Sequence, residues 1–248
     1  MHRFFVDRSQ ISGEVVTISG EDLKHIKNVL RLKEGEEVSI CDGEENDYVA
    51  VIESIDSQEV LLSIVESFKS KGEAPIKLKL YQGLPKGDKM ELIVQKCTEL
   101  GVSEIVPMAT KRAVVKLSDE KKIAKKLERW QKIAEEAAKQ SKRGRIPLVD
   151  RLVTLKEAVS ELGEDELALM LYESERENSL KKALRGYDGK NVSVFVGPEG
   201  GFEESEAEML KAAGAKVVSL GNRILRTETA GLAASAVIMY ELGDLGDI

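Results

Sequence analysis

Residues 192–202 read VSVFVGPEGGF, and this segment carries the strongest structural signal in the chain. Its first five residues are nearly all apolar, which is typical of a strand buried on both faces of a parallel sheet. A glycine-rich loop follows, and the pattern at 203–213 predicts a helix directly after it. Strand, glycine-rich loop and helix in this order indicate an α/β domain that binds its ligand at the carboxyl ends of its strands.

The same alternation of strands and helices extends over residues 76–248. Further apolar strands are predicted at 77–84, 104–108, 167–172 and 216–220, and helices at 88–100, 119–141 and 229–240. Asp88 and Glu91 resemble a capping box at the start of the helix at 88–100. The sequence therefore predicts a mostly parallel sheet with helices between its strands.

Residues 1–70 have a different pattern. Short runs rich in β-branched and aromatic residues occur at 3–6, 14–18, 37–41, 47–55 and 60–68. One helix interrupts them, with Ser19 as its expected N-cap and an apolar stripe of Leu23, Ile26, Val29 and Leu30. We expect a small β-barrel at 1–70, a polar linker at 71–75 and the α/β domain at 76–248.

Composition and charge limit the classes of function. The chain has 248 residues, of which 42% are hydrophobic and 33% charged, so it can bury a core and is not disordered. No apolar stretch is long enough to span a bilayer, and the first ten residues do not resemble a secretory signal. Two cysteines and two histidines, all distant in sequence, predict neither a disulfide framework nor a metal site. A cytoplasmic protein without membrane contact is expected.

The net charge of −7 conceals a basic segment. Residues 86–147 contain 16 Lys or Arg against 9 Asp or Glu, and acidic segments lie on both sides. A local basic stripe can bind phosphates even in an acidic protein. The alternative is a solvated lysine-rich helix surface.

The loop 197–201 lacks the spacing of a dinucleotide fingerprint and the Lys-Ser/Thr of a P-loop. Glu199 would also repel phosphate, so the loop suits a neutral or cationic ligand such as an adenosyl sulfonium. The alternative is a tight structural turn.

A second dense segment, LGNRILRTETA at 220–230, places Arg226 and Glu228 between apolar elements, where charges are usually paired or functional. A structural ion pair of Arg226 with Glu228 or Glu199 is the alternative. Thr227 is an expected cap of the final helix.

The final helix has no charged residue from 229 to 240 and is rich in small residues. A helix that is apolar on all sides is buried. It is therefore either a central core helix or a helix that also packs against a second subunit.

The segments GPEGGFEESE (197–206) and LGNRILRTETA (220–230) strongly resemble the ribosomal small subunit methyltransferase E family of the SPOUT class. The resemblance continues at 25–38, 86–112 and 129–147 and covers nearly the whole chain. It implies S-adenosylmethionine-dependent methylation of N3 of a uridine in 16S rRNA, in the free rRNA or the 30S subunit. It also implies a trefoil knot near the C-terminus, a homodimer with its active site at the subunit interface, and an N-terminal PUA-like barrel that docks RNA.

The resemblance also implies roles for individual residues. The cofactor-binding residues would be Leu171, Tyr172, Gly197, Pro198, Glu199, Gly200, Gly201, Leu220, Gly221, Ile224, Leu225, Arg226 and Thr229. Because the N3 proton must leave, Arg226 is the expected stabiliser of developing charge, and Glu228 is either the base or an orienting partner. The expected RNA-binding residues are Lys139, Lys142, Arg143 and Arg145, extended by Arg112, Lys116 and Arg31.

Two other functions remain open at this point. A SPOUT enzyme that methylates a ribose 2′-hydroxyl or a tRNA base would share the fold and the cofactor. A non-catalytic RNA-binding assembly factor would have a degenerate site, and the intact motifs argue against it.

Overall fold

The computed structural model describes residues 1–44, 46–114 and 119–246, and the chain divides into two compact units. The first unit consists of Met1–Glu73 together with Ala138–Ile146. The second consists of Ala74–Ala137 together with Pro147–Ile248. The change of unit after residue 73 falls within the segment 71–75, where the sequence predicts a linker.

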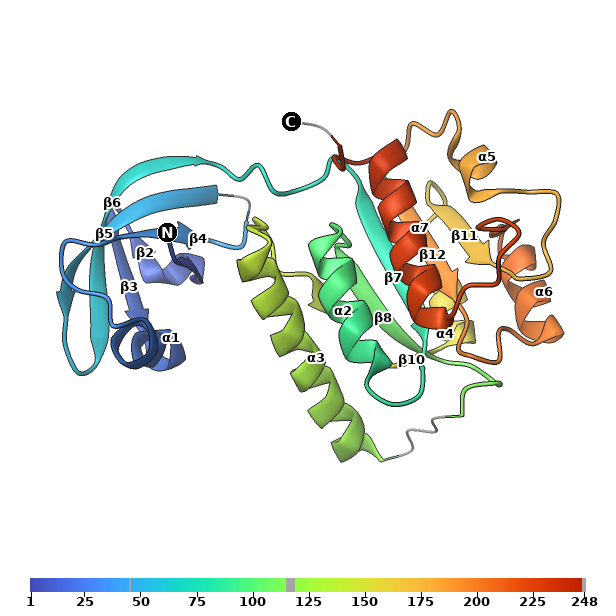
Figure 1. The fold of residues 1–248 in the computed structure, drawn as a ribbon, viewed down its shortest axis with the longest axis horizontal. Helices are drawn as coiled ribbons and strands as arrows, with labels where there is room; N and C mark the ends of the chain where they lie inside the picture. Colours follow the sequence, from blue (N-terminus) through green and yellow to red (C-terminus); the bar gives the residue numbers. More distant parts are fainter. Residues whose placement is uncertain (45, 115–118, 247–248) are drawn as a thin grey trace. The chain divides into compact units, whose positions relative to one another are not determined.

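The first unit is built on a curled six-stranded sheet (Figure 1). Its strands are β1 (Arg3–Phe5), β2 (Ile11–Ser12), β3 (Val15–Ser19), β4 (Glu37–Cys41), β5 (Asn46–Ile55) and β6 (Glu59–Lys69). The order is β1-β4-β5-β6-β3-β2, and only the β1–β4 pair is parallel. Apolar side chains on one face, including Phe4, Ile18, Ile40, Ile52 and Leu62, form the core of this unit. A short helix η1 (Arg8–Gln10) precedes β2.

The helix of this unit differs from the predicted stripe. It consists of α1 (Gly20–Lys24) and a wider π-type segment, η2 (His25–Leu30). Ser19 occupies the N-cap position, but its side chain makes no capping hydrogen bond. Leu23 and Ile26 are buried as expected, whereas Val29 is 65% exposed. The wider turns of η2 rotate Val29 away from the core, because a π-helix has more residues per turn than the expected α-helix.

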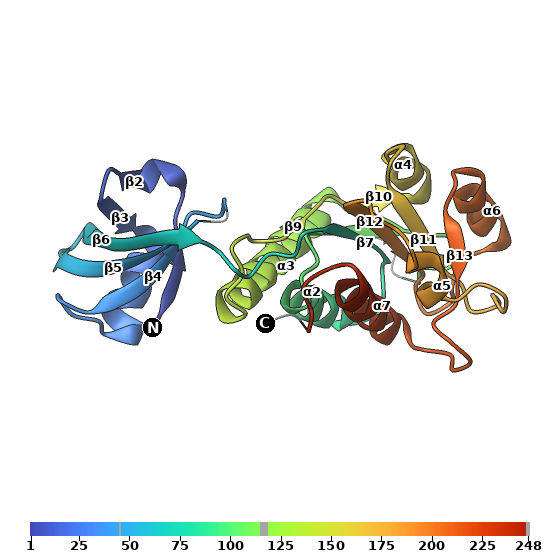
Figure 2. The ribbon, with the colours of Figure 1, turned by 90° about the horizontal axis from the view of Figure 1, so that it is seen from above.

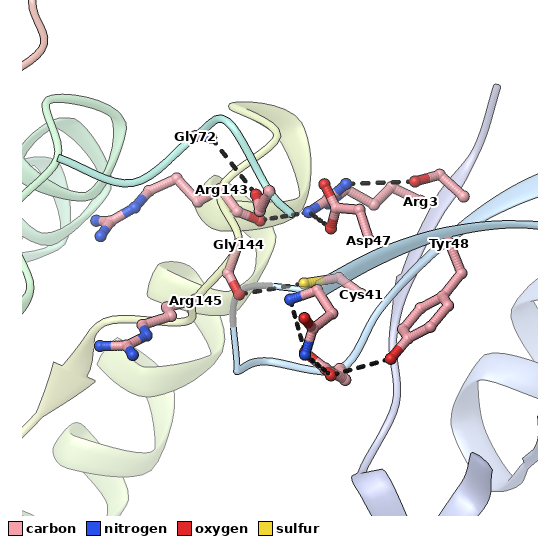
Figure 3. Close-up of polar contacts among 12 residues, drawn as sticks. Arg3, Cys41, Asp47, Tyr48, Gly72, Arg143, Gly144 and Arg145 are labelled. Atoms are coloured by element: carbon pink, nitrogen blue, oxygen red, sulfur yellow. Dashed lines mark hydrogen bonds and ion pairs between the residues drawn. The ribbon is translucent and has the colours of Figure 1, made fainter. Parts of the chain in front are cut away.

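The segment 138–146 joins the first unit through backbone and side-chain contacts (Figure 3). The guanidinium of Arg3 donates a hydrogen bond of 2.7 Å to the carbonyl of Arg143. The buried thiol of Cys41 donates one of 3.2 Å to the carbonyl of Gly144. The sequence gives no sign of these contacts, because their partners lie more than one hundred residues apart.

The second unit contains a seven-stranded sheet in which every pairing is parallel. Its strands are β7 (Lys77–Gly83), β8 (Glu104–Ala109), β9 (Leu148–Val149), β10 (Val153–Thr154), β11 (Leu167–Leu171), β12 (Asn191–Val196) and β13 (Lys216–Val218). The order is β10-β8-β7-β12-β11-β13, and β9 pairs with β8. The strand β12 therefore lies between β7 and β11, which both precede it in the chain.

Helices cover both faces of this sheet (Figure 2). They are α2 (Lys89–Glu99), α3 (Glu120–Gln140), α4 (Leu155–Ser160), α5 (Leu180–Leu184), α6 (Glu204–Ala212) and α7 (Thr227–Glu241). Side chains of α2, α3, α5 and α7 share one apolar core with alternate strand residues such as Leu80, and those of α4 and α6 share the other with Tyr81. The Tyr81 and Phe195 rings stack in that second core with their centroids 4.5 Å apart. The predicted sheet with two buried faces is confirmed.

The helix α2 begins without the predicted capping box. Asp88 is the N-cap residue, but its side chain makes no capping hydrogen bond. The carboxylate of Glu91 accepts a hydrogen bond of 2.8 Å from Arg129 on α3 instead. Pairing with a neighbouring helix therefore replaces the local cap.

Candidate active site

The loops that follow β11, β12 and β13 enclose a cavity at the carboxyl edge of the second sheet. Its volume is about 340 Å³, within the usual range of small-molecule sites. The predicted cofactor-binding residues that line it are Leu171, Tyr172, Gly197, Pro198, Glu199, Gly201, Leu220, Gly221, Ile224, Leu225 and Arg226. Residues that lie 55 positions apart in the sequence thus meet in one site, because parallel strands end at the same edge.

Gly200 and Thr229 are predicted cofactor-binding residues that are not among the residues lining this cavity. A Cβ atom at Gly200 would lie 3.0 Å from the Cβ of Arg112 and 3.3 Å from its carbonyl oxygen. Arg112 also donates a hydrogen bond of 3.1 Å to the Gly200 carbonyl. A side chain at Gly200 would therefore meet Arg112.

Glycine is required at Gly221 for a conformational reason. Its φ is +114°, a backbone conformation that other residues rarely adopt, and a Cβ atom there would meet nothing within 4 Å. The chain thus turns sharply after β13 and leaves open space beside a residue that lines the cavity.

Thr227 connects three elements of the cavity wall by hydrogen bonds. It is the first residue of α7, whose N-cap is Arg226, so the prediction that Thr227 caps this helix is wrong. Its hydroxyl donates a hydrogen bond of 2.6 Å to the carbonyl of Gly197 and accepts one of 2.9 Å from the amide of Gln82. The ends of β7 and β12 are thereby bonded to the start of α7.

A lysine that the sequence analysis did not single out joins the two predicted acidic residues of the site. Lys89, in the first turn of α2, places its Nζ 2.9 Å from Glu199 Oε1 and 3.2 Å from Glu228 Oε2. It also lines the cavity, whereas Glu228 is not among the lining residues. One feature of the sequence could have indicated a role for Lys89. It lies in the first turn of a predicted helix, where the helix dipole disfavours a positive charge.

Arg226 lies exposed at the mouth of the cavity. Its predicted structural ion pairs with Glu199 and Glu228 are not formed, because both carboxylates contact Lys89. Within the described part of the chain, neither Arg226 nor Arg223, which also lines the cavity, takes part in an ion pair. Both guanidinium groups are therefore available to an anionic or polar ligand.

The predicted RNA-binding residues fall into distinct environments. Arg31, Arg112, Lys142 and Arg145 are exposed. Lys139 is mostly covered, with its Nζ 3.5 Å from Asp22. Lys116 lies outside the described residues.

Arg143 is placed differently from the prediction, because it is only 4% exposed. Its guanidinium pairs with the carboxylate of Glu73 at 2.7 Å. That carboxylate also accepts hydrogen bonds of 3.0 Å from the backbone amides of Gly144 and Arg145. Arg143 thus stabilises the turn that holds its exposed neighbours (Figure 3), and it does not present its charge to RNA.

The described residues contain neither a candidate metal site nor a candidate membrane span. Within residues 1–44, 46–114 and 119–246, no group of three or more His, Cys, Asp or Glu side chains could hold a metal ion. No helix in the same ranges combines the length and the apolar character needed to cross a membrane.

Family models match both parts of the chain. The model of an RNA methyltransferase domain matches residues 72–239, and that of an RNA methyltransferase PUA domain matches residues 18–65. The first match covers the whole cavity, and the second lies within the curled sheet of the first unit.

Curated proteins and solved structures agree with these matches. The ribosomal RNA small subunit methyltransferase E of Bacillus subtilis is 36% identical, over 97% of each chain. The enzyme of the same name from Neisseria gonorrhoeae, solved bound to S-adenosyl methionine, is 32% identical with a TM-score of 0.89, covering 98% of this chain and 99% of that one. A putative methyltransferase from Legionella pneumophila in complex with the same cofactor is 33% identical with a TM-score of 0.86, over 98% of each chain.

Proposed function

The chain belongs to the ribosomal RNA small subunit methyltransferase E family, and from this premise we propose that it methylates N3 of a uridine in 16S rRNA, within the 30S subunit. It is an S-adenosylmethionine-dependent rRNA methyltransferase with a PUA domain. The observation that supports the catalytic assignment best is the cavity, at which residues of both sequence motifs converge.

The cavity fits this cofactor. Apolar side chains of Leu171, Leu220 and Leu225 can contact an adenosine, and the left-handed Gly221 opens space beside them. The loop after β12 lacks the Lys-Ser/Thr of a P-loop, which would instead favour phosphate. The cofactor supplies an electrophilic methyl group when it is bound.

Methylation of uracil N3 requires that its proton leaves, and the protein has to make this loss favourable. As this proton leaves, negative charge develops on the ring oxygens O2 and O4, and a positioned cation stabilises that charge. Arg226 is exposed at the cavity mouth and forms no ion pair with any residue that the structure describes, so its guanidinium is available for this role. Glu228 contacts Lys89 and does not line the cavity, which favours the orienting role over that of the base. The N3 proton then passes to water.

Analysis of modified nucleosides tests this function directly. We expect 16S rRNA from a strain that lacks this gene to lose 3-methyluridine, as measured by mass spectrometry, and to regain it when the gene is restored. Loss of a 2′-O-methylated nucleoside or of a tRNA modification would instead support another SPOUT activity. No change in any nucleoside would support a non-catalytic assembly role. Methylation of purified 30S particles but not of free 16S rRNA would establish the particle as the substrate.

We also propose that the enzyme is a homodimer in the cytoplasm and that α7 provides its subunit interface. The outward side of α7 contains Tyr240, which is 70% exposed, and Val237. These residues line an apolar groove together with Leu180, Leu220 and Ala236. A second copy of an equally apolar surface is the self-complementary partner expected in a two-fold dimer.

A further inference from the structure

The side chain of Lys89 connects two elements that form the cavity. Its ammonium lies between Glu199, in the loop after β12, and Glu228, in the first turn of α7. Glu199 Oε1 also accepts a hydrogen bond of 3.1 Å from the backbone amide of Lys86, so the loop before α2 and the first residue of α2 both hold this carboxylate. Three segments that are distant in sequence therefore meet at one ammonium group.

The stability of α2 does not account for a lysine at this position. The backbone amides at a helix N-terminus carry partial positive charge, and a cation in the first turn is unfavourable there. Glu91, in the same turn, is the type of residue that the helix dipole favours. The favourable contacts of Lys89 are made outside its own helix, with the carboxylates of the cavity wall.

Lys89 also determines the charge of this wall. Two carboxylates that share one site repel each other unless a cation lies between them. Burial tends to raise the pKa of Glu199, but hydrogen bonds from Lys89 and from the Lys86 amide outweigh burial, so this pKa is lowered. The pKa of Lys89 is raised, chiefly by its hydrogen bond to Glu199. Other charged groups packed around them are Glu173, Arg176, Arg223 and Arg226 on the cavity wall, Arg112 at Gly200 and the Glu91–Arg129 pair.

We propose that Lys89 is a positioning residue of the cofactor site, which fixes the loop 197–201 and the start of α7 by bridging Glu199 and Glu228. The proposal rests on the assignment of this cavity to S-adenosylmethionine. Arg226 is the N-cap residue of α7 and Glu228 is the second residue of this helix, so anchoring Glu228 also restrains the backbone of Arg226. Glu228 Oε2 is buried and accepts no hydrogen bond within the described part of the chain, and the ammonium of Lys89 at 3.2 Å is its ion-pair partner.

The test is calorimetric titration of the full-length protein with S-adenosylmethionine and with S-adenosylhomocysteine, over about pH 5.5 to 8.5. We expect Lys89→Met to weaken binding of both ligands by about tenfold or more, as is typical when a group that orients ligand-binding residues is lost. The loss is expected to be larger at low pH, because the hydrogen bond from Lys89 helps to lower the pKa of Glu199, and without it this carboxylate retains its proton to a higher pH. The wild-type affinity should vary little over this pH range. Lys89→Arg should restore most of that affinity and the same weak dependence on pH.

Lys96→Met is the matched control, because Lys96 lies on the same helix and, among the described residues, forms an ion pair with Glu99 alone, three residues away. It should bind both ligands as the wild type does. Equal or tighter binding by Lys89→Met, with an unchanged pH profile, would overturn the proposal, as would a loss that Lys89→Arg fails to restore. The titration uses no RNA, so its result is independent of the uridine-N3 assignment, which the nucleoside analysis tests separately.

Discussion

At the scale of single residues, two basic side chains adopt a backbone conformation that costs stability. Arg31 and Lys142 have φ values of +55° and +60°, and they are the non-glycine residues with positive φ in the described part of the chain. Glycine would adopt this conformation without strain. Both residues are exposed long cations, so we interpret the strained backbone as a means of presenting these side chains to phosphate.

We therefore expect Arg31→Gly and Lys142→Gly to separate stability from RNA binding. Each change should raise the free energy of unfolding by up to about 1 kcal/mol, because the left-handed backbone is no longer strained. Each should also weaken binding to 30S particles. The slope of the logarithm of the binding constant against the logarithm of the salt concentration should become shallower by about one. Chemical denaturation and binding at several salt concentrations measure the two effects. Unchanged RNA affinity in both variants would show that these residues have no contact with RNA.

The catalytic assignment belongs to the same scale. Arg226→Ala should lower the single-turnover rate of methyl transfer by about 100-fold, as when one stabiliser of developing charge is removed. If Glu228 orients the site through Lys89, Glu228→Gln should lower the rate equally at all pH values. A rate that recovers at high pH would instead identify Glu228 as the base, because hydroxide would then replace it.

At the scale of elements, the mostly buried carboxylate of Glu73 adds to the contacts that hold the segment after α3 in the first unit. Glu73 accepts hydrogen bonds from the guanidinium of Arg143 and from the amides of Gly144 and Arg145. A Cβ atom at Gly144 would lie 2.5 Å from the side chain of Ser70, so the two segments pack closely. This turn therefore depends on Arg143 for its structure, while its neighbours are exposed.

Arg143→Ala should consequently act on stability more than on RNA contacts. We expect a loss of about 3 kcal/mol in the free energy of unfolding, because a buried carboxylate loses its partner. Lys142→Ala, one residue away and exposed, should change stability by less than about 0.5 kcal/mol. Thermal and chemical unfolding of the two variants provide the comparison. Similar stabilities would contradict the structural role of Arg143.

The elements also show how far the sequence determines the site. Strands such as β11 and β12 could be predicted because both of their faces are buried, and the loops after them follow from the parallel arrangement. Two sets of contacts could not be predicted, namely those of Glu73 with 143–145 and those of Lys89 with two glutamates. They join residues about 70 or more positions apart and therefore leave no local pattern in the sequence. The trefoil knot that the resemblance implies stays a prediction.

At the scale of the whole molecule, the structure changes which residue of α7 can test the proposed dimer. Ala234 lies in the middle of the uncharged stretch 229–240, so the sequence alone would suggest a carboxylate at this position as the test. Ala234 is completely buried in the core of its own unit, beside Ile238 and Met239. Ala234→Glu would thus bury an unpaired charge within the monomer and destabilise it by several kcal/mol, whether or not a dimer exists.

Tyr240→Glu is the sharper test, because Tyr240 is mostly exposed on the outward side of the same helix. In the monomer this change should alter the free energy of unfolding by less than about 0.5 kcal/mol. In a dimer that buries this surface, each carboxylate would lose water without gaining a partner, so the subunits should separate. Sedimentation should then show a folded monomer, and methyl transfer should fall if the partner completes the site. A wild-type protein that sediments as a monomer, or a Tyr240→Glu dimer with full activity, would exclude this face of α7 as the interface.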